Sequence, residues 1–328
     1  ADWSLKDRDG RTALDLATQN GKSELAELLR GYDGKIYFYE PLWHCRWDAL
    51  RLIGRGGFGE VHEVRTDTGV TCAAKTLRLP VQLGDELPSV STEIHRAVES
   101  ENLCRLRHPN IVRFLHIAQP EPATVVVFME LLDGRSLERF IDNQPLDELT
   151  IRDFSEQICR ALLYLHSRQP PVIHRDINCS NIIVCADNTR IKLIDFGLSI
   201  KLEQSSLPKG TLNFMAPELL GAGESDSVQY SRESDIWAFG LLGLPDGVRR
   251  EAPFANAKSL LEMAQLIDRK GAPALPDGRS AELRDFYSRC TAKDRRRRRP
   301  AQELLEHEFL TGRKLQPGFF SSFFSTRK

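Results

Sequence analysis

The chain has 328 residues, 41% of them hydrophobic, which is enough to form the cores of two or three domain-sized units. Its 45 basic and 46 acidic side chains leave a formal net charge of −1, which excludes a global attraction to nucleic acid or to an anionic membrane. The seven cysteines contain no CxxC pair, and no apolar run approaches the roughly 20 residues that span a bilayer, so we expect a cytoplasmic protein without a cysteine-bound zinc ion.

The N-terminal residues 1–33 carry two short helical patterns separated by Gly21. Residues 12–17 read TALDLA and resemble the TPLHxA signature of an ankyrin repeat. Because one such repeat cannot bury its own apolar face, we interpret residues 1–33 as the remnant of an ankyrin-type module that binds a protein partner. An ordinary helical hairpin packed on the next domain is the alternative. The chain begins at Ala1 rather than Met, and we expect it to be part of a longer protein.

A connector, residues 34–46, leads into two runs that predict strands on either side of a turn at residues 67–69. Later in the chain, apolar residues recur at a spacing of three and four residues, which predicts a long buried helix. These residues are Ile151, Phe154, Ile158, Leu162 and Leu165. Strands early and helices late predict an α+β enzyme with two unequal lobes. The basic run at residues 295–299 is interpreted as a solvated face rather than as a nucleic-acid patch.

A glycine-rich run lies between the first two predicted strands. Gly54, Gly56 and Gly59 form the pattern G-x-G-x-x-G-x-V, which ends at Val61, and the missing side chains let backbone N–H groups close over phosphates. A dinucleotide-binding fold would use such glycines to open a helix, whereas here a strand follows. Lys75 comes 16 residues after Gly59, and a buried lysine on a strand needs an acidic partner, for which an acid on the next helix is the natural candidate.

The most specific pattern is the run from His174 to Asn181, HRDINCSN, followed 14 residues after Asn181 by the triplet DFG, which begins at Asp195. Phosphoryl transfer needs carboxylate and amide ligands for a metal ion, and an acceptor for the proton of the attacking hydroxyl. Asp195 and Asn181 are candidates to hold Mg²⁺, and Asp176 is a candidate to orient the hydroxyl. The ordered set is far more specific than any single triplet.

These motifs, together with APE at residues 216–218 and DIWAFG at residues 235–240, resemble the eukaryotic protein kinase catalytic domain from about residue 48 to residue 310. The resemblance implies a bilobal fold over residues 47–310, with a β-rich N-lobe at about 47–130, a helical C-lobe at about 131–310 and a C-terminal tail at 311–328. It also implies transfer of the γ-phosphoryl group of Mg-ATP to hydroxyl groups of protein substrates.

The same resemblance implies roles for individual residues. Lys75 would pair with Glu99, and Glu93 and Glu101 remain alternatives. Met129 would be the gatekeeper and residues 130–132 the hinge that contacts adenine. The residues implied to contact the nucleotide are Ile53, Gly54, Gly56, Gly59, Val61, Ala73, Lys75, Glu99, Met129, Glu130, Leu132, Ser136 and Ile183. The residues implied to form a stacked apolar spine are Leu103, Phe114, His174 and Phe196. Glu218 would pair with Arg298 or Arg299.

The segment before the APE motif, GTLNFM, is similar to that of serine/threonine kinases, because tyrosine kinases usually place a proline and a tryptophan there. Both the MAP-kinase-cascade group and the tyrosine-kinase-like group remain open. Phosphorylation in the activation segment is a possible switch, since phosphate there can pair with Arg175. The hydroxyl residues of that segment are Ser199, Ser205, Ser206 and Thr211.

Three positions differ from the family pattern, and one of them is Ser136, which offers a hydroxyl where the family commonly has an acidic ribose ligand. Asn178 stands where serine/threonine kinases carry a lysine that meets the γ-phosphate, so the sequence predicts that Asn178→Lys raises kcat. Pro245 interrupts what the pattern predicts as a long buried helix. An active kinase is the leading hypothesis. A pseudokinase that acts as a scaffold and an ankyrin-type adaptor are the alternatives.

Overall fold

The computed structural model describes residues 46–56, 59–78, 103–121, 124–141, 146–195, 213–220, 230–242 and 253–312, together with Arg11, Leu16, Gln19 and Asn20. The rest of the ankyrin-like segment, nearly all of the connector and most of the C-terminal tail therefore lie outside the described residues. The same is true of several residues that the sequence singled out, namely Glu93, Glu99, Glu101, Phe196, Ser199, Ser205, Ser206, Thr211 and Pro245.

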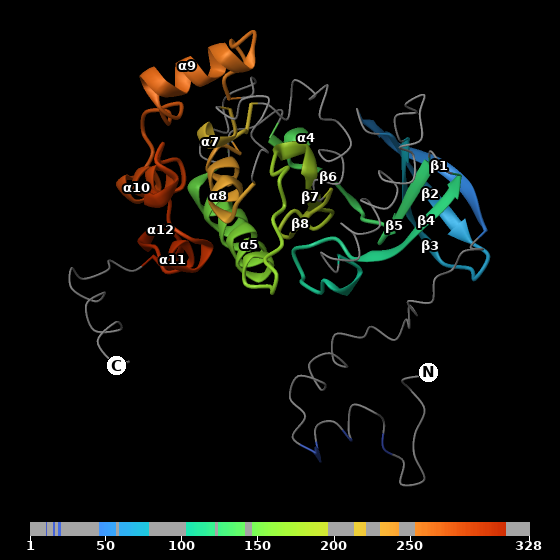
Figure 1. The fold of residues 1–328 in the computed structure, drawn as a ribbon. Coiled ribbons are helices and arrows are strands. Elements are labelled where there is room, and N and C mark those ends of the chain that lie inside the picture. Colours follow the sequence, from blue (N-terminus) through green and yellow to red (C-terminus); the bar gives the residue numbers. More distant parts are fainter. Residues whose placement is uncertain are drawn as a thin grey trace.

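A five-stranded antiparallel sheet forms the N-terminal lobe, at the right of Figure 1, with the strand order β1-β2-β3-β5-β4. The turn predicted at residues 67–69 joins β2 to β3, as expected. The strands are β1 (Trp47–Gly56), β2 (Gly59–Thr66), β3 (Thr71–Arg78), β4 (Phe114–Glu121) and β5 (Thr124–Met129).

Side chains of β3 alternate between two faces of the sheet, and both faces are buried. Ala73 and Leu77 pack in the main core, whereas Cys72 and Ala74 pack in a separate cluster on the other face. Lys75 lies on this strand and is only 7% exposed. Because a buried ammonium group is costly without a counter-charge, the fold requires an anion near Lys75.

A second, three-stranded sheet lies between the first sheet and the helices (Figure 1). Its strands are β6 (Gly134–Ser136), β7 (Ile182–Cys185) and β8 (Ile191–Leu193). The backbone N–H of Leu193 donates to the carbonyl of Asn110 at 2.9 Å, and Leu193 accepts from the N–H of Val112 at 2.8 Å. These bonds tie the second sheet to the segment that leads into β4, and so connect the two lobes.

The remaining described elements are mostly helical and form the C-terminal lobe (Figure 1). The α-helices are α4 (Leu137–Ile141), α5 (Glu148–His166), α7 (Pro217–Leu220), α8 (Arg232–Gly240), α9 (Leu260–Lys270), α10 (Ala281–Cys290), α11 (Ala301–Leu305) and α12 (Glu308–Thr311). Short 3-10 turns are η1 (Leu103–Arg105), η2 (Cys179–Asn181) and η3 (Arg295–Arg297). Among the described residues, no helix has the length and apolar character needed to cross a bilayer.

Helix α5 confirms the long buried helix that the sequence predicts. All five apolar residues of the pattern are buried on one side of α5. Asp147 caps its N-terminus, because its carboxylate accepts a hydrogen bond from the N–H of Thr150 at 2.7 Å. The helix therefore combines an apolar stripe with a defined start, and it packs in the same core as β7, β8 and α11.

Helix α8 lies at the centre of the C-terminal lobe, with Trp237 fully buried. It approaches α10 closely, since a Cβ atom on Gly240 would lie 2.5 Å from Cγ2 of Thr291 and 2.8 Å from Cβ of Cys290. The helix ends at Gly240. Pro245, at which the sequence predicted an interruption of this helix, lies outside the described residues.

The two lobes, one rich in β-strands and one helical, confirm the predicted α+β bilobal fold. The predicted ankyrin-like hairpin falls outside the described residues.

Candidate active site

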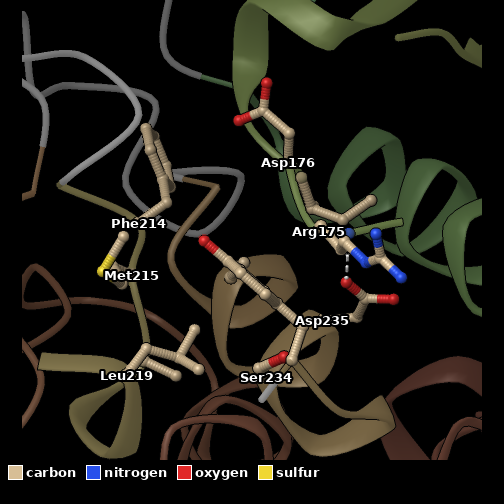
Figure 2. A pocket seen from close by; sticks show the side chains of 11 residues that line it. Arg175, Asp176, Phe214, Met215, Leu219, Ser234 and Asp235 are labelled. Atoms are coloured by element: carbon tan, nitrogen blue, oxygen red, sulfur yellow. Dashed lines mark hydrogen bonds between the residues drawn. The ribbon is translucent and has the colours of Figure 1, made fainter. Parts of the chain in front are cut away.

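A buried carboxylate on α8, that of Asp235, holds the start of the loop at residues 174–181. Asp235, which is 1% exposed, accepts hydrogen bonds from the N–H of His174 at 2.8 Å and of Arg175 at 2.9 Å. Its other neighbour is Nε2 of His166, at 2.9 Å. Figure 2 shows the contact between Arg175 and Asp235 as a dashed line. Arg175 adopts a left-handed conformation, with φ of 72°, and such strain persists only where the surroundings hold it.

Asp176 is the one carboxylate in the loop at residues 174–181, and both of its oxygens accept hydrogen bonds. Nδ2 of Asn181 donates to Oδ2 of Asp176 at 2.7 Å, and Nδ2 of Asn178 donates to Oδ1 at 2.8 Å. Burial raises the pKa of Asp176 to about 6, while these hydrogen bonds and the charge of Lys75 lower it. The carboxylate is thus held at both oxygens, with a pKa close to the range in which a group can exchange protons at neutral pH.

Lys75 meets Asp195 across the two lobes, with its Nζ 2.8 Å from Oδ2 of the carboxylate. Asp195 adopts a left-handed conformation with φ of 57°, directly after β8. The N–H of Ile194 donates to the carbonyl of Asn181 at 2.9 Å and so places Asp195 beside the loop at residues 174–181. The sequence had assigned Glu99 to Lys75, with Glu93 and Glu101 as alternatives, and all three lie outside the described residues. The ion pair of Lys75 with Asp195 joins positions 120 residues apart, and no local sequence pattern indicates it.

Within each sheet, strand pairing places some of the residues expected to contact a nucleotide opposite one another. Val61 lies opposite Lys75, and Ala73 lies opposite Met129 at the end of β5. On the second sheet, Ser136 lies opposite Ile183. Ile53 is 44% exposed on β1, so its apolar side chain is available to a ligand.

Gly54 and Gly59 differ in how strictly they require glycine. A Cβ on Gly59, whose φ is +143°, would lie 1.8 Å from the carbonyl oxygen of Thr76, whereas a Cβ on Gly54 would meet nothing within 4 Å. Gly59 therefore permits the close approach of β2 to β3 next to Lys75. Packing does not require a glycine at position 54. Contact between the backbone there and a ligand would explain why the glycine-rich pattern includes it.

Glu130, the residue directly after β5, makes contacts that the sequence did not indicate. The carboxylate of Glu130 accepts from the N–H of Arg113 at 2.8 Å and from Nζ of Lys192 at 2.5 Å. Lys192 lies on β8, three residues before Asp195. The expected adenine-contacting segment is thus tied to the strand that leads to Asp195. Lys192 is the one charged residue of β8, between two apolar residues, and this was the available signal in the sequence.

The ion pair of Glu218 decides between two alternatives. Nη1 and Nη2 of Arg298 each donate to the carboxylate of Glu218 at 2.7 Å, and the Arg298 side chain is fully buried. Arg299 instead pairs with Glu303 at the surface. Four arginines of the basic run, Arg295, Arg296, Arg297 and Arg299, are exposed, so the interpretation of this run as a solvated face is confirmed for them and wrong for Arg298.

A pocket opens beside Asp176 (Figure 2). Phe214, Met215 and Leu219 supply apolar lining, and Tyr230 lines the pocket as well. Burial raises the pKa of Tyr230 to about 12, so its hydroxyl stays protonated and able to donate. The pocket joins an apolar surface to the carboxylate of Asp176.

The donor set suits a hard divalent cation. Because Nδ2 of Asn181 is committed to Asp176, Oδ1 is the atom of that amide that can take a cation, and Asp195 supplies carboxylate oxygen. Such oxygen ligands match Mg²⁺, which is usually bound by one or two protein groups together with substrate phosphates. No cluster of three or more His, Cys, Asp or Glu side chains that could hold a metal ion occurs in the described part of the chain.

Comparison with known proteins gives a consistent assignment. The chain is 32% identical over 280 residues to "Mitogen-activated protein kinase kinase kinase 1a" of Physcomitrium patens, which covers 84% of this chain and 35% of that protein. It is 32% identical over 266 residues to "Mitogen-activated protein kinase kinase kinase 1" of Arabidopsis thaliana, covering 80% and 42%. It is 32% identical over 236 residues to "Probable serine/threonine-protein kinase WNK6" of Oryza sativa subsp. japonica, covering 70% and 52%.

The chain thus spans about a third to a half of the length of these relatives. The family model for the protein kinase domain matches residues 47–310, which include both lobes and all of the contacts described above. From this match and from the geometry of the catalytic loop, the chain belongs to the protein kinase domain family.

Proposed function

We propose that this chain is an ATP-dependent protein kinase that transfers the γ-phosphoryl group of ATP to serine or threonine hydroxyls of protein substrates. The observation that carries the proposal is the convergence of Lys75, Asp176, Asn181 and Asp195 at the junction of the lobes, through hydrogen bonds of 2.7 and 2.9 Å and an ion pair of 2.8 Å. The relatives named as MAP kinase kinase kinases and as a serine/threonine-protein kinase support the same activity.

Each of these residues has a distinct task in the proposed mechanism. Asp176 accepts the hydrogen bond of the substrate hydroxyl and orients its oxygen toward the phosphorus, because its own oxygens are fixed by Asn178 and Asn181. Lys75 presents its ammonium group to the phosphates. Asn181 and Asp195 would hold Mg²⁺, which supplies charge neutralisation on the phosphates when bound with ATP.

The nucleotide is proposed to lie against the first sheet, under the glycine-rich run of β1 and β2. Val61, Ala73 and Met129 offer apolar contact to the adenine ring, and the backbone of residues 130–132 offers hydrogen bonds to its edge. We assign the pocket beside Asp176 to the protein substrate, because an acceptor hydroxyl must reach that carboxylate.

Narrower assignments rest on the relatives and on composition. We propose that the chain acts in the MAP-kinase-cascade group, in the cytoplasm, and that residues 1–33 are an ankyrin-type remnant that contacts a protein partner. The pseudokinase alternative finds no support in the described residues, since the four side chains that the chemistry requires are present and in contact.

The test is transfer of labelled phosphate from ATP, with Mg²⁺, to generic protein substrates, followed by mapping of the phosphorylated residues. We expect phosphoserine or phosphothreonine with the wild type and a loss of about 10²-fold or more in Asp195→Asn. Asp187→Asn, a change of the same kind on the exposed turn between β7 and β8, should keep the wild-type rate. Wild-type turnover in Asp195→Asn would show that the proposed metal ligand is assigned incorrectly.

A further inference from the structure

Asn178 occupies a buried position at the entrance to η2, and it is only 7% exposed. Its side chain faces two different groups, one at each end of the amide. The two ends make different kinds of hydrogen bond, because the NH2 group can only donate and the carbonyl oxygen can only accept. The contacts at each end therefore fix how the amide is oriented.

The nitrogen end faces the carboxylate of Asp176. Nδ2 of Asn178 lies 2.8 Å from Oδ1 of Asp176. Asn181 donates to the other carboxylate oxygen at 2.7 Å, so the two amides hold the carboxylate from both sides. A carboxylate held at both oxygens has little freedom to rotate, and the direction of its free lone pairs is set by these donors.

The oxygen end holds the backbone of the loop. Oδ1 of Asn178 accepts from the N–H of Ser180 at 3.0 Å, from its Oγ at 2.6 Å and from the N–H of Asn181 at 3.1 Å. Three donors at one atom leave no room for the flipped amide, which would place NH2 against them. This oxygen therefore caps η2 and fixes Asn181, the second donor to Asp176.

We propose that Asn178 is a positioning residue for phosphoryl transfer, which orients the carboxylate of Asp176 directly through its NH2 group and indirectly by capping the turn that carries Asn181. This inference rests on the proposed kinase activity of the same site. This role requires both ends of the Asn178 amide, the NH2 group as a donor to Asp176 and the oxygen as the acceptor that caps η2.

From the sequence alone, Asn178→Lys was expected to raise kcat. The contacts of Asn178 lead to a different expectation. A lysine can donate to Asp176, but it offers no acceptor for Ser180 and Asn181, so the turn loses its cap. Asn178 is therefore not simply a weaker phosphate contact. Asn178→Lys is expected not to exceed the wild-type kcat.

The test separates the two ends of the amide in the full chain. Asn178→Ser keeps a capping oxygen, since serine is a preferred N-cap residue, but its single short hydroxyl cannot also reach Asp176. Asn178→Asp has the shape of asparagine and two acceptor oxygens but no N–H, and it serves as the second variant if serine weakens the fold. Asn178→Ala removes both ends. Asp147→Ser, which exchanges one N-cap residue for another on α5, is the matched control.

The readouts are kcat, the KM for ATP and the midpoint of thermal unfolding. We expect Asn178→Ser and Asn178→Asp to lose on the order of tenfold or more in kcat, as for a lost hydrogen bond to a charged group, with the KM for ATP changed less than about twofold. Their unfolding midpoints should stay closer to the wild type than that of Asn178→Ala. Asp147→Ser should keep the wild-type kcat.

Two results would overturn the inference. One is a kcat within about twofold of wild type in both Asn178→Ser and Asn178→Asp, which would show that Asn178 caps η2 but does not orient Asp176 for the reaction. The other is a kcat several-fold above wild type in Asn178→Lys, which would make the position a phosphate contact. A wild-type chain that transfers no phosphate at all would instead contradict the proposed function, so the two failures are distinguishable.

Discussion

At the scale of the single residue, the environment of Asp176 determines how the site responds to pH. The carboxyl group is buried, and burial disfavours its charged form, so its pKa rises to about 6. The nearby charge of Asp195 raises this pKa further, whereas the donors Asn181 and Asn178 and the charge of Lys75 lower it. The proposed role requires the ionised form, which can accept a hydrogen bond from the substrate.

We therefore expect kcat/KM for ATP to fall as the pH decreases through about 6, since this parameter reports groups of the free enzyme. Protonation of Asp176 does not itself unfold the protein, so acid unfolding through this carboxyl group is not the cause of the expected fall in kcat/KM. A carboxyl whose folded pKa is raised binds its proton more tightly in the folded state, so its contribution to stability increases as the pH falls from 6 toward the ordinary value. Nucleotide binding measured by fluorescence across the same range checks that the fold persists. Half-maximal activity near pH 4 would contradict the assignment.

At the scale of secondary structure elements, the contact between Glu218 and Arg298 joins α7 to the turn η3. The Arg298 side chain is fully buried, and it also donates to the carbonyls of Ala292, Lys293 and Glu233. Its guanidinium group lies over the ring of Trp237, 4.9 Å from the centroid. One arginine thus connects α7 and α8, which both contribute residues to the pocket, with η3.

Breaking a buried ion pair from one side leaves the remaining charge without its partner. We expect Glu218→Gln to lower the free energy of unfolding by about 3 kcal/mol, the lower end of the usual range because three carbonyls still accept from Arg298. Glu303→Gln is the matched control. It removes the partner of Arg299 from an exposed pair, and it should cost less than about 1 kcal/mol. Urea unfolding measures both variants, and equal losses would show that burial of the pair is not decisive.

At the scale of the whole molecule, the site exists only where the two lobes meet. Lys75 comes from the five-stranded sheet, and Asp195 follows the last strand of the second sheet. Their ion pair and the backbone bonds of Leu193 cross the junction. The proposed chemistry therefore depends on how the lobes are joined as well as on each lobe.

Lys75→Met tests this dependence. We expect a loss of about 10²-fold or more in phosphate transfer, because a neutral side chain can neither contact phosphates nor hold Asp195. The control is Arg51→Met, which removes an exposed cation from a surface pair with Glu63 on the same sheet and should leave transfer unchanged. Similar rates for Lys75→Met and the wild type would show that transfer does not depend on this ion pair.

Local patterns in the sequence were sufficient for several features. The buried residues of α5 recur with the period of a helix, and the strands around the turn at residues 67–69 follow from composition and turn residues. The identity of Asp176, Asn181 and Asp195 as candidates also came from order and spacing alone. These features depend on neighbours along the chain, which a sequence displays directly.

The sequence by itself determined the fold class and the candidate residues, and the tertiary structure decided which side chains meet. Lys75 is paired with Asp195, Arg298 rather than Arg299 is buried against Glu218, and the amide of Asn178 is turned onto Asp176. Whether Arg298 or Arg299 pairs with Glu218 depends on which of them the turn η3 directs into the core. The ion pair of Lys75 with Asp195 depends on how the two sheets are joined. Such contacts are set by packing in three dimensions, because residues distant in sequence have no local pattern that records their proximity.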